Sequence, residues 1–188
     1  GETALGELAA LVKDNVSTDQ VNNVLSNFST EGSYSLMNSF LGFIPGSIGE
    51  TSVLAVLIGA SILLMTGLGS WRIMFSALLG GFFMASIFKL WGANPFMELN
   101  PIHQLCIGGF MFAIVFMATD PVSAAQTNTG KLIYGFLCGF LGIMIRVFNP
   151  AYPEGIMLAI LFMNVMAPLI DHYVVEASVK RRISRVNI

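Results

Sequence analysis

Two carboxylates, Asp120 and Asp171, are the residues of this sequence best suited to chemistry. Each lies close to a proline in or at the end of a long apolar run. Asp120 and Pro121 come directly after a run that ends at Thr119, and Asp171 lies three residues after Pro168 in a later run. A charged side chain is costly in hydrocarbon, and a proline frees a backbone carbonyl one turn before it. Carboxylates beside free carbonyls and hydroxyls are ligands for hard cations. Asp120 and Asp171 are therefore candidates for a pathway that takes up a monovalent cation.

Three further acids lie near the apolar runs. Glu50 precedes the first long run, where the N-terminus of a helix would also favour a carboxylate, and we keep it as a third candidate for the cation pathway. Glu98 and Glu154 are expected to be solvated acids of loops or first helical turns. The sequence contains no Gly-x-x-x-x-Gly-Lys loop and no Cys-x-x-Cys or Ser-His-Asp arrangement. Any catalysis would therefore depend on a bound cofactor, and no catalytic side chain is predicted.

The composition around these acids is typical of a membrane protein. Of the 188 residues 55% are hydrophobic and only 11% are charged, and the mean hydropathy is +0.75. In soluble domains roughly a quarter of the residues are charged. The net charge of -2 leaves no basic surface for phosphates, which argues against a nucleic-acid partner. The expected fold is an all-α integral membrane protein in contact with membrane lipid.

Five apolar runs have about the 20 residues that a bilayer requires. They cover approximately residues 51–68, 71–91, 101–119, 131–148 and 154–177. The expected domains are a polar extracytoplasmic segment (1–38), a re-entrant or interfacial element interrupted by Pro and Gly (39–50), a five-helix transmembrane domain (51–177) and a basic cytoplasmic tail (178–188). Paired glycines predict close helix packing at Gly80–Gly81, Gly108–Gly109, and Gly135 with Gly139.

The basic residues predict the orientation of the chain. The tail carries four of the nine Lys and Arg residues, which places it in the cytoplasm by the positive-inside rule. Counting back through five spans puts the 120–131 loop on the cytoplasmic side and the N-terminal segment outside. Lys89 and Arg146 fall near the outer side, where we expect both side chains to snorkel to the membrane surface.

Four stretches, in order along the chain, resemble one family of membrane redox proteins. They are residues 43–52, 116–124, 149–155 and 167–172. These stretches are similar to the C-terminal half of the B subunit of the sodium-translocating NADH:quinone oxidoreductase, and to the D subunit of the related RNF complex. The resemblance covers nearly everything after residue 40 or so. It implies that the chain is half of a larger two-repeat subunit, whose N-terminal spans precede Gly1.

The resemblance also implies cofactors and partners. In the family a Thr in a Ser-Gly-Ala-Thr pattern carries FMN through a phosphodiester bond, and the matching residue here is Thr3, with Glu2 in place of Ala. A non-covalent riboflavin, electron transfer towards ubiquinone and sodium export are implied as well. The implied setting is a multi-subunit complex of the bacterial inner membrane. The orientation deduced from charge puts Thr3 outside the cytoplasm, where the family attaches its flavin.

Three functions are open at this point. The first is a flavin-carrying membrane subunit of a sodium-pumping NADH:quinone reductase. The second is the D subunit of an RNF-type ferredoxin:NAD oxidoreductase, which differs in electron donor and acceptor. The third is a passive channel or solute carrier, because two-repeat membrane folds serve pores as well.

Overall fold

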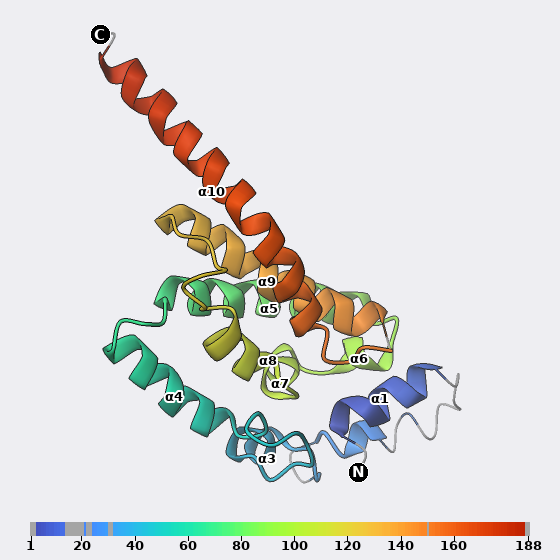
Figure 1. Cartoon of the computed structure of the whole chain (residues 1–188). Coiled ribbons are helices and arrows are strands. Elements are labelled where there is room, and N and C mark those ends of the chain that lie inside the picture. Colours follow the sequence, from blue (N-terminus) through green and yellow to red (C-terminus); the bar gives the residue numbers. More distant parts are fainter. Residues whose placement is uncertain (1–2, 14–20, 22–23, 30–31, 150, 187–188) are drawn as a thin grey trace.

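The computed structural model describes residues 3–13, 21, 24–29, 32–149 and 151–186, and within these ranges every regular element is a helix (Figure 1). In chain order the helices are α1 (Ala4–Lys13), α3 (Leu36–Leu41), α4 (Val53–Met65), α5 (Trp71–Trp91), α6 (Pro95–Glu98), α7 (Pro101–Cys106), α8 (Phe110–Phe112), the π-helix η1 (Ala113–Met117), α9 (Asn128–Phe148) and α10 (Ile156–Val186). The predicted all-α class is confirmed.

Three of these helices are long and apolar enough to cross a membrane: α5, α9 and α10. They lie where the second, fourth and fifth apolar runs predicted them. Local signals set their ends: the Thr127 hydroxyl accepts the Gly130 N–H at 3.0 Å and caps α9, while α5 ends at Gly92 in the left-handed conformation. Hydropathy together with caps therefore accounts for the membrane-spanning part of the fold.

The first and third predicted spans form shorter pieces. Helix α4 has only 13 residues and ends before Gly67, whose φ of +74° favours glycine. The third run is divided into α7, α8 and η1, and the break between α7 and α8 falls at Gly108, with φ +67°. The Gly108–Gly109 pair predicted as a helix-packing face is thus the break itself, and this prediction was wrong. The π-helix that follows is a rare form that is frequent at functional sites.

The region predicted as a re-entrant or interfacial element begins within α3. This helix ends at Gly42, which has φ +94°, and residues 43–52 follow as turns that lead into α4. The Ser52 hydroxyl accepts the Ala55 N–H at 3.3 Å and starts α4. Glu50 therefore lies in a loop, two residues before a helix cap.

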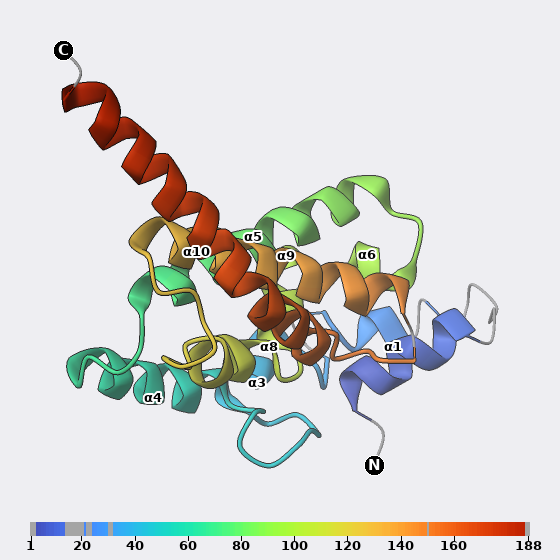
Figure 2. The same cartoon turned by 45° about the horizontal axis from the view of Figure 1, so that its top comes forward.

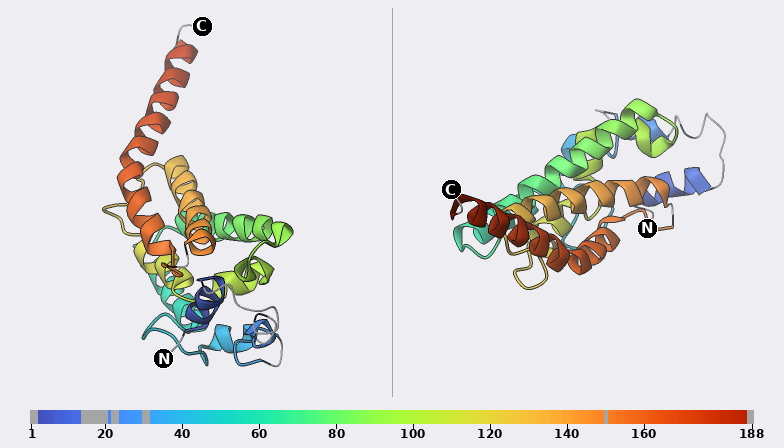
Figure 3. Two further views of the ribbon diagram at one scale, coloured as in Figure 1. Left: turned by 90° about the vertical axis from the view of Figure 1, so that its right-hand side faces the viewer. Right: turned by 90° about the horizontal axis from the view of Figure 1, so that it is seen from above.

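Helices α5 and α9 form the most extensive helix pair of the molecule and lie side by side in two views (Figures 2 and 3). Glycine permits their approach: a side chain at Gly139 would collide with the Ala77 carbonyl, and one at Gly80 with the Phe136 carbonyl. The predicted close packing at these glycines is confirmed.

Helix α10 packs along α9 and then continues beyond the other helices, so its C-terminal turns lie far from α1 (Figures 1 and 3). Its 31 residues correspond to a length of about 46 Å, against about 30 Å for the hydrocarbon core of a bilayer. The last turns of α10 therefore extend past the thickness that a membrane-spanning helix needs.

Candidate functional site

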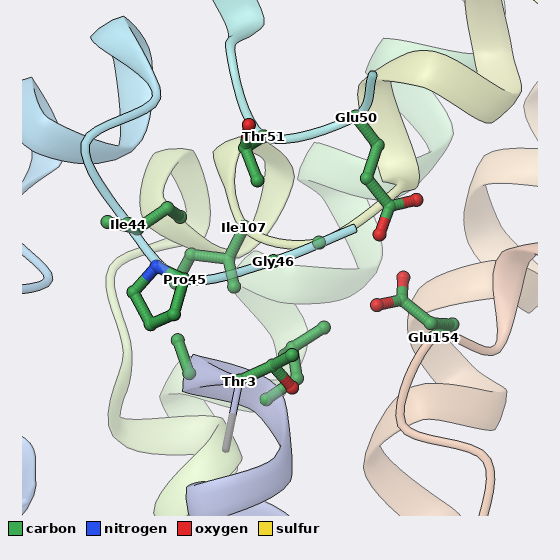
Figure 4. A pocket seen from close by; sticks show the side chains of 11 residues that line it. Thr3, Ile44, Pro45, Gly46, Glu50, Thr51, Ile107 and Glu154 are labelled. Atoms are coloured by element: carbon green, nitrogen blue, oxygen red, sulfur yellow. The ribbon is translucent and has the colours of Figure 1, made fainter. Parts of the chain in front are cut away.

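A small pocket brings together Thr3, Glu50 and Glu154, three residues that lie far apart in the sequence (Figure 4). The N-terminus of α1, the loop before α4, the α7–α8 break and the loop before α10 each supply part of its wall. Its interior of about 20 Å³ has room for one water-sized molecule. The pocket therefore suits an ion or a water, and a larger group attached at its rim would lie outside it.

Thr3 caps α1. Its hydroxyl oxygen accepts the Gly6 N–H at 3.1 Å, and its carbonyl accepts the Glu7 N–H at 3.0 Å. The side chain is half-buried at the rim of the pocket. This local role explains a threonine here without any cofactor, so the structure leaves the predicted attachment of FMN untested. Glu2, the residue that departs from the family pattern, lies outside the described residues.

The Glu154 carboxylate contacts the break between α7 and α8. Its carboxylate accepts the Gly109 N–H at 2.8 Å, at the N-terminal end of α8. A Cβ at Gly108 would lie 2.8 Å from the same carboxylate oxygen, so glycine is required there by space as well as by its φ. Glu154 was expected to be a solvated acid, and this prediction was wrong, because its side chain is half-buried and its carboxylate accepts the Gly109 N–H.

The side chain of Glu50 faces that of Glu154 across the pocket (Figure 4). A Cβ at Gly109 would lie 2.5 Å from the nearer Glu50 carboxylate oxygen and 3.4 Å from that of Glu154. Within the described part of the chain, the Glu50 carboxylate has no hydrogen bond or ion pair. Two half-buried carboxylates thus converge on one glycine with a single backbone donor between them, an arrangement that attracts a cation.

Arg146 stabilises the other side of the break. It is only 1% exposed and donates to the carbonyls of Gln104 and Ile107, the second at 3.3 Å. These are carbonyls at the C-terminal end of α7, which the broken helix leaves without partners of its own. The prediction that Arg146 snorkels to the surface was wrong: its guanidinium points into the protein and replaces the hydrogen bonds of a continuous helix. Lys89, for which the same was expected, is exposed.

Asp120 lies at the end of η1, in a tight turn. The Ser123 hydroxyl and the Ser123 N–H both donate to one Asp120 oxygen, at 2.6 and 3.0 Å. The hydrogen bond from the Ser123 hydroxyl, and then that from its N–H, lower the pKa of Asp120 below its ordinary value. The carboxylate borders a cavity of about 50 Å³ that also includes Ser70, Thr119 and Lys131. Asp120 therefore stays ionised in a small polar cavity.

Asp171 holds the start of α9. One carboxylate oxygen accepts the Gln126 N–H at 2.6 Å, and the other accepts the Thr127 N–H at 3.1 Å and the Thr127 hydroxyl at 2.6 Å. This carboxylate is well satisfied by protein donors, so it has a structural role whether or not it also contacts a cation. Asp120 and Asp171 are not brought into contact; each is bound to one part of the same 120–130 loop.

The predicted site residues thus fall into two groups at opposite ends of α4. Glu50 lies beside its start in the pocket with Thr3, whereas Leu68 and Ser70, just past its end, share the cavity of Asp120. This agrees with the predicted separation of Thr3 and Asp120. Which end faces the cytoplasm stays a prediction.

Comparison with known proteins identifies the family. The sequence profile of the NQR2, RnfD, RnfE family matches residues 2–180. The chain belongs to this family. It is 55% identical over 154 residues to the B subunit of the Na(+)-translocating NADH-quinone reductase of Chromohalobacter salexigens, and 53% identical over 153 residues to that of Azotobacter vinelandii. The corresponding B subunit from Ectopseudomonas mendocina is 50% identical over 167 residues. The resemblance drawn from the four motifs is confirmed.

These alignments cover most of this chain and less than half of each relative. They include 81%, 80% and 88% of this chain, but 38%, 38% and 40% of the respective relative. The chain thus spans about two fifths of the length of these NQR2, RnfD, RnfE family relatives. Their names describe subunits of an oxidoreductase that translocates sodium.

The sequence analysis missed the break between α7 and α8 and the roles of the two side chains that stabilise it, Glu154 and Arg146. The signal for the break was present, since Gly108–Gly109 interrupts an apolar run after a proline-started helix. Glu154 had no comparable signal, because its role depends on the distant N–H of Gly109. Arg146 near the end of a long apolar run was equally compatible with snorkelling.

Proposed function

We propose that this chain is part of the membrane-embedded B subunit of a sodium-translocating NADH:quinone reductase, in which Thr3 carries FMN. The observation that carries the proposal is the family match over residues 2–180, together with relatives that are 50–55% identical and are named as B subunits. The Thr3 hydroxyl lies at the N-terminus of α1 and at the rim of a pocket lined by Glu50 and Glu154, where an attached group would lie outside the pocket.

The residues around Thr3 fit a phosphodiester at its hydroxyl. Among the described residues the oxygen accepts one hydrogen bond, and the N-terminus of the ten-residue helix α1 presents N–H groups and the positive end of its dipole to an anion. The carboxylates of Glu50 and Glu154 disfavour a phosphate inside the pocket, so the group would point outwards from it. When bound, the flavin would supply the electron acceptor and donor that the side chains lack.

The two groups of acids fit the two ends of a sodium pathway. Asp120 and Asp171 border the polar loop at one end of α4, and Glu50 with Glu154 lies at the other. With the basic tail in the cytoplasm, the first pair would take up sodium and the second would lie near its release. Carboxylate oxygens would replace part of the hydration shell of the ion at each end.

The wider setting is part of the same proposal. The names of the relatives support assembly with other subunits of a quinone reductase, and from the family resemblance we infer the bacterial inner membrane, electron transfer towards ubiquinone, and a non-covalent riboflavin within the membrane part. The sequence assigns no residue to the riboflavin or to the quinone. The D subunit of the RNF type is a member of the same family, but the 50–55% identical relatives favour the reductase.

The test uses the complete complex in sealed vesicles. NADH with ubiquinone is expected to drive sodium transport, and transport should stop without an electron donor. Transport driven by ferredoxin and NAD in place of quinone would assign the chain to the RNF type. Sodium flux that persists without any donor would indicate a passive channel.

A further inference from the structure

A groove between the first turn of α9 and the last third of α10 lies outside the two pockets described above, and it adjoins Asp171 through Thr127. It encloses about 350 Å³. Its apolar wall is formed by Val174, Val175 and Val179 of α10, and Arg182 closes one end on the same face of that helix. The groove thus combines an apolar surface with one guanidinium.

The opposite wall supplies neutral polar groups. Thr127, Asn128 and Thr129 come from the start of α9, and Ser178 faces them from α10. Arg72 donates to the Asn128 side-chain oxygen at 2.7 Å, which leaves the Asn128 amide NH₂ as a donor. The Arg182 side chain is exposed and has no ion pair among the described residues. These groups match the oxygens of an anionic head group.

Positive charge is concentrated at this end of the molecule. Six of the nine Lys and Arg residues lie here: Arg72, Lys131, Lys180, Arg181, Arg182 and Arg185. The acids at this end are fewer: they are Asp120, Asp171 and Glu176, and Glu176 pairs with Lys180 at 2.8 Å. This end of the molecule therefore carries a surplus of positive charge.

The groove also lies at the depth of a membrane surface. The 21 residues of α9 correspond to about 31 Å, close to the hydrocarbon thickness, so its first turn reaches the head-group region. Basic pockets between spanning helices at this depth bind anionic phospholipid head groups. The valines would contact the glycerol and upper acyl region of the same lipid.

We propose that the groove between α9 and α10 binds an anionic phospholipid, with its phosphate at Arg182 and Asn128. The lipid would occupy the space where α10 leaves the bundle and fix the position of its projecting turns. The proposal does not depend on flavin attachment or on the sodium pathway.

The test compares two neighbouring arginines in the full-length protein within its purified complex. Arg182 lines the groove, whereas Arg181 lies about 100° away around the helix and does not. Wild type, Arg182→Gln and Arg181→Gln would be reconstituted in nanodiscs of phosphatidylcholine with phosphatidylglycerol, and the lipid that remains after transfer to detergent would be counted by native mass spectrometry. Thermal melting of each variant would check the fold.

Wild type is expected to retain phosphatidylglycerol over phosphatidylcholine. Arg182→Gln should reduce this retention about fivefold, the equivalent of about 1 kcal/mol per basic side chain near a membrane, and Arg181→Gln by less than about twofold. Ser178→Trp, which fills the groove without changing charge, should reduce it as Arg182→Gln does.

Four results would overturn the proposal. Equal loss in both arginine variants would indicate diffuse charge attraction, and equal retention of phosphatidylcholine would indicate ordinary lipid contact. Displacement of the lipid by inorganic phosphate would indicate a site for free anions. If the Arg182→Gln complex loses a neighbouring subunit while it retains as much phosphatidylglycerol as wild type, the groove binds an acidic protein surface.

Discussion

The hydroxyl of Thr127 donates a hydrogen bond to the Asp171 carboxylate across 2.6 Å, and this contact joins α10 to the start of α9. Asp171 therefore has two separable roles, as acceptor for a loop and as a candidate ligand for sodium. Variants that alter one role and spare the other can distinguish them.

Asp171→Asn is expected to raise the sodium concentration needed for half-maximal quinone reduction severalfold, with flavin content unchanged, because it removes the charge. Thr127→Val removes the hydroxyl that donates to Asp171 and also caps α9, but it keeps the charge of Asp171. It should therefore cost at least about 1.5–3 kcal/mol of stability and leave sodium dependence unaltered. Steady-state rates against sodium and thermal melting measure the two effects. Parallel changes in both variants would reduce Asp171 to its structural role.

Removing the charge of Glu154 should weaken cation binding at the pocket with Thr3. Glu154→Gln keeps an oxygen for the Gly109 N–H, so the α7–α8 break should persist. We expect sodium-stimulated turnover to fall severalfold in this variant and in Glu50→Gln, because the two carboxylates converge on one point. Glu98→Gln, which alters an exposed acid outside the pocket, is the control. Activity equal to that control would remove the pair from the sodium pathway.

Replacing Arg146 should destabilise the break between α7 and α8. Arg146→Met leaves the buried carbonyls of Gln104 and Ile107 without a donor, at a cost of about 1–3 kcal/mol for each. Lys89→Gln changes an exposed cation and should have little effect. The melting temperatures of the two variants in detergent provide the comparison, and similar values would show that Arg146 does not hold the break.

The pH dependence of Asp120 should depend on Ser123. Hydrogen bonds from Ser123 lower the pKa of the carboxyl, so the bonded turn is fully stabilised above the ordinary carboxyl pKa and is lost as the pH falls through the lowered value. Ser123→Ala should move this transition to higher pH. Infrared titration of the carboxylate band would measure it, with Asp120→Asn to assign the band. An unchanged transition in Ser123→Ala would contradict this origin of the shift.

The sequence predicted the parts of the fold that depend on local pattern. The runs that became α5, α9 and α10 are long and predominantly apolar, and the glycines at 80, 135 and 139 indicated where two of them meet. The division of the third run was not predicted, because a Gly pair in an apolar stretch is compatible with both a packing face and a break. The choice depends on Arg146 and Glu154, which supply hydrogen bonds from other helices.

The sequence identified the candidate site residues one by one, but it did not show which of them lie together. Thr3 and Glu50 were identified for different reasons, and only the path of the chain from α1 to α4 shows that they share a pocket. Asp120 and Asp171 were expected to serve one pathway, and they do border one loop, but their hydrogen-bond donors could not be read from spacing alone.

Attachment of flavin to Thr3 is the central claim, and in-gel fluorescence tests it most directly. The full-length protein, expressed with a flavin transferase, should give a fluorescent band after denaturation. Thr3→Ala should abolish the band and cost about 1 kcal/mol through loss of the α1 cap. Thr3→Asn retains a capping side chain but cannot form the phosphodiester, so it should melt like wild type and still lack fluorescence. A fluorescent Thr3→Asn band, or a wild-type band without fluorescence, would contradict the account.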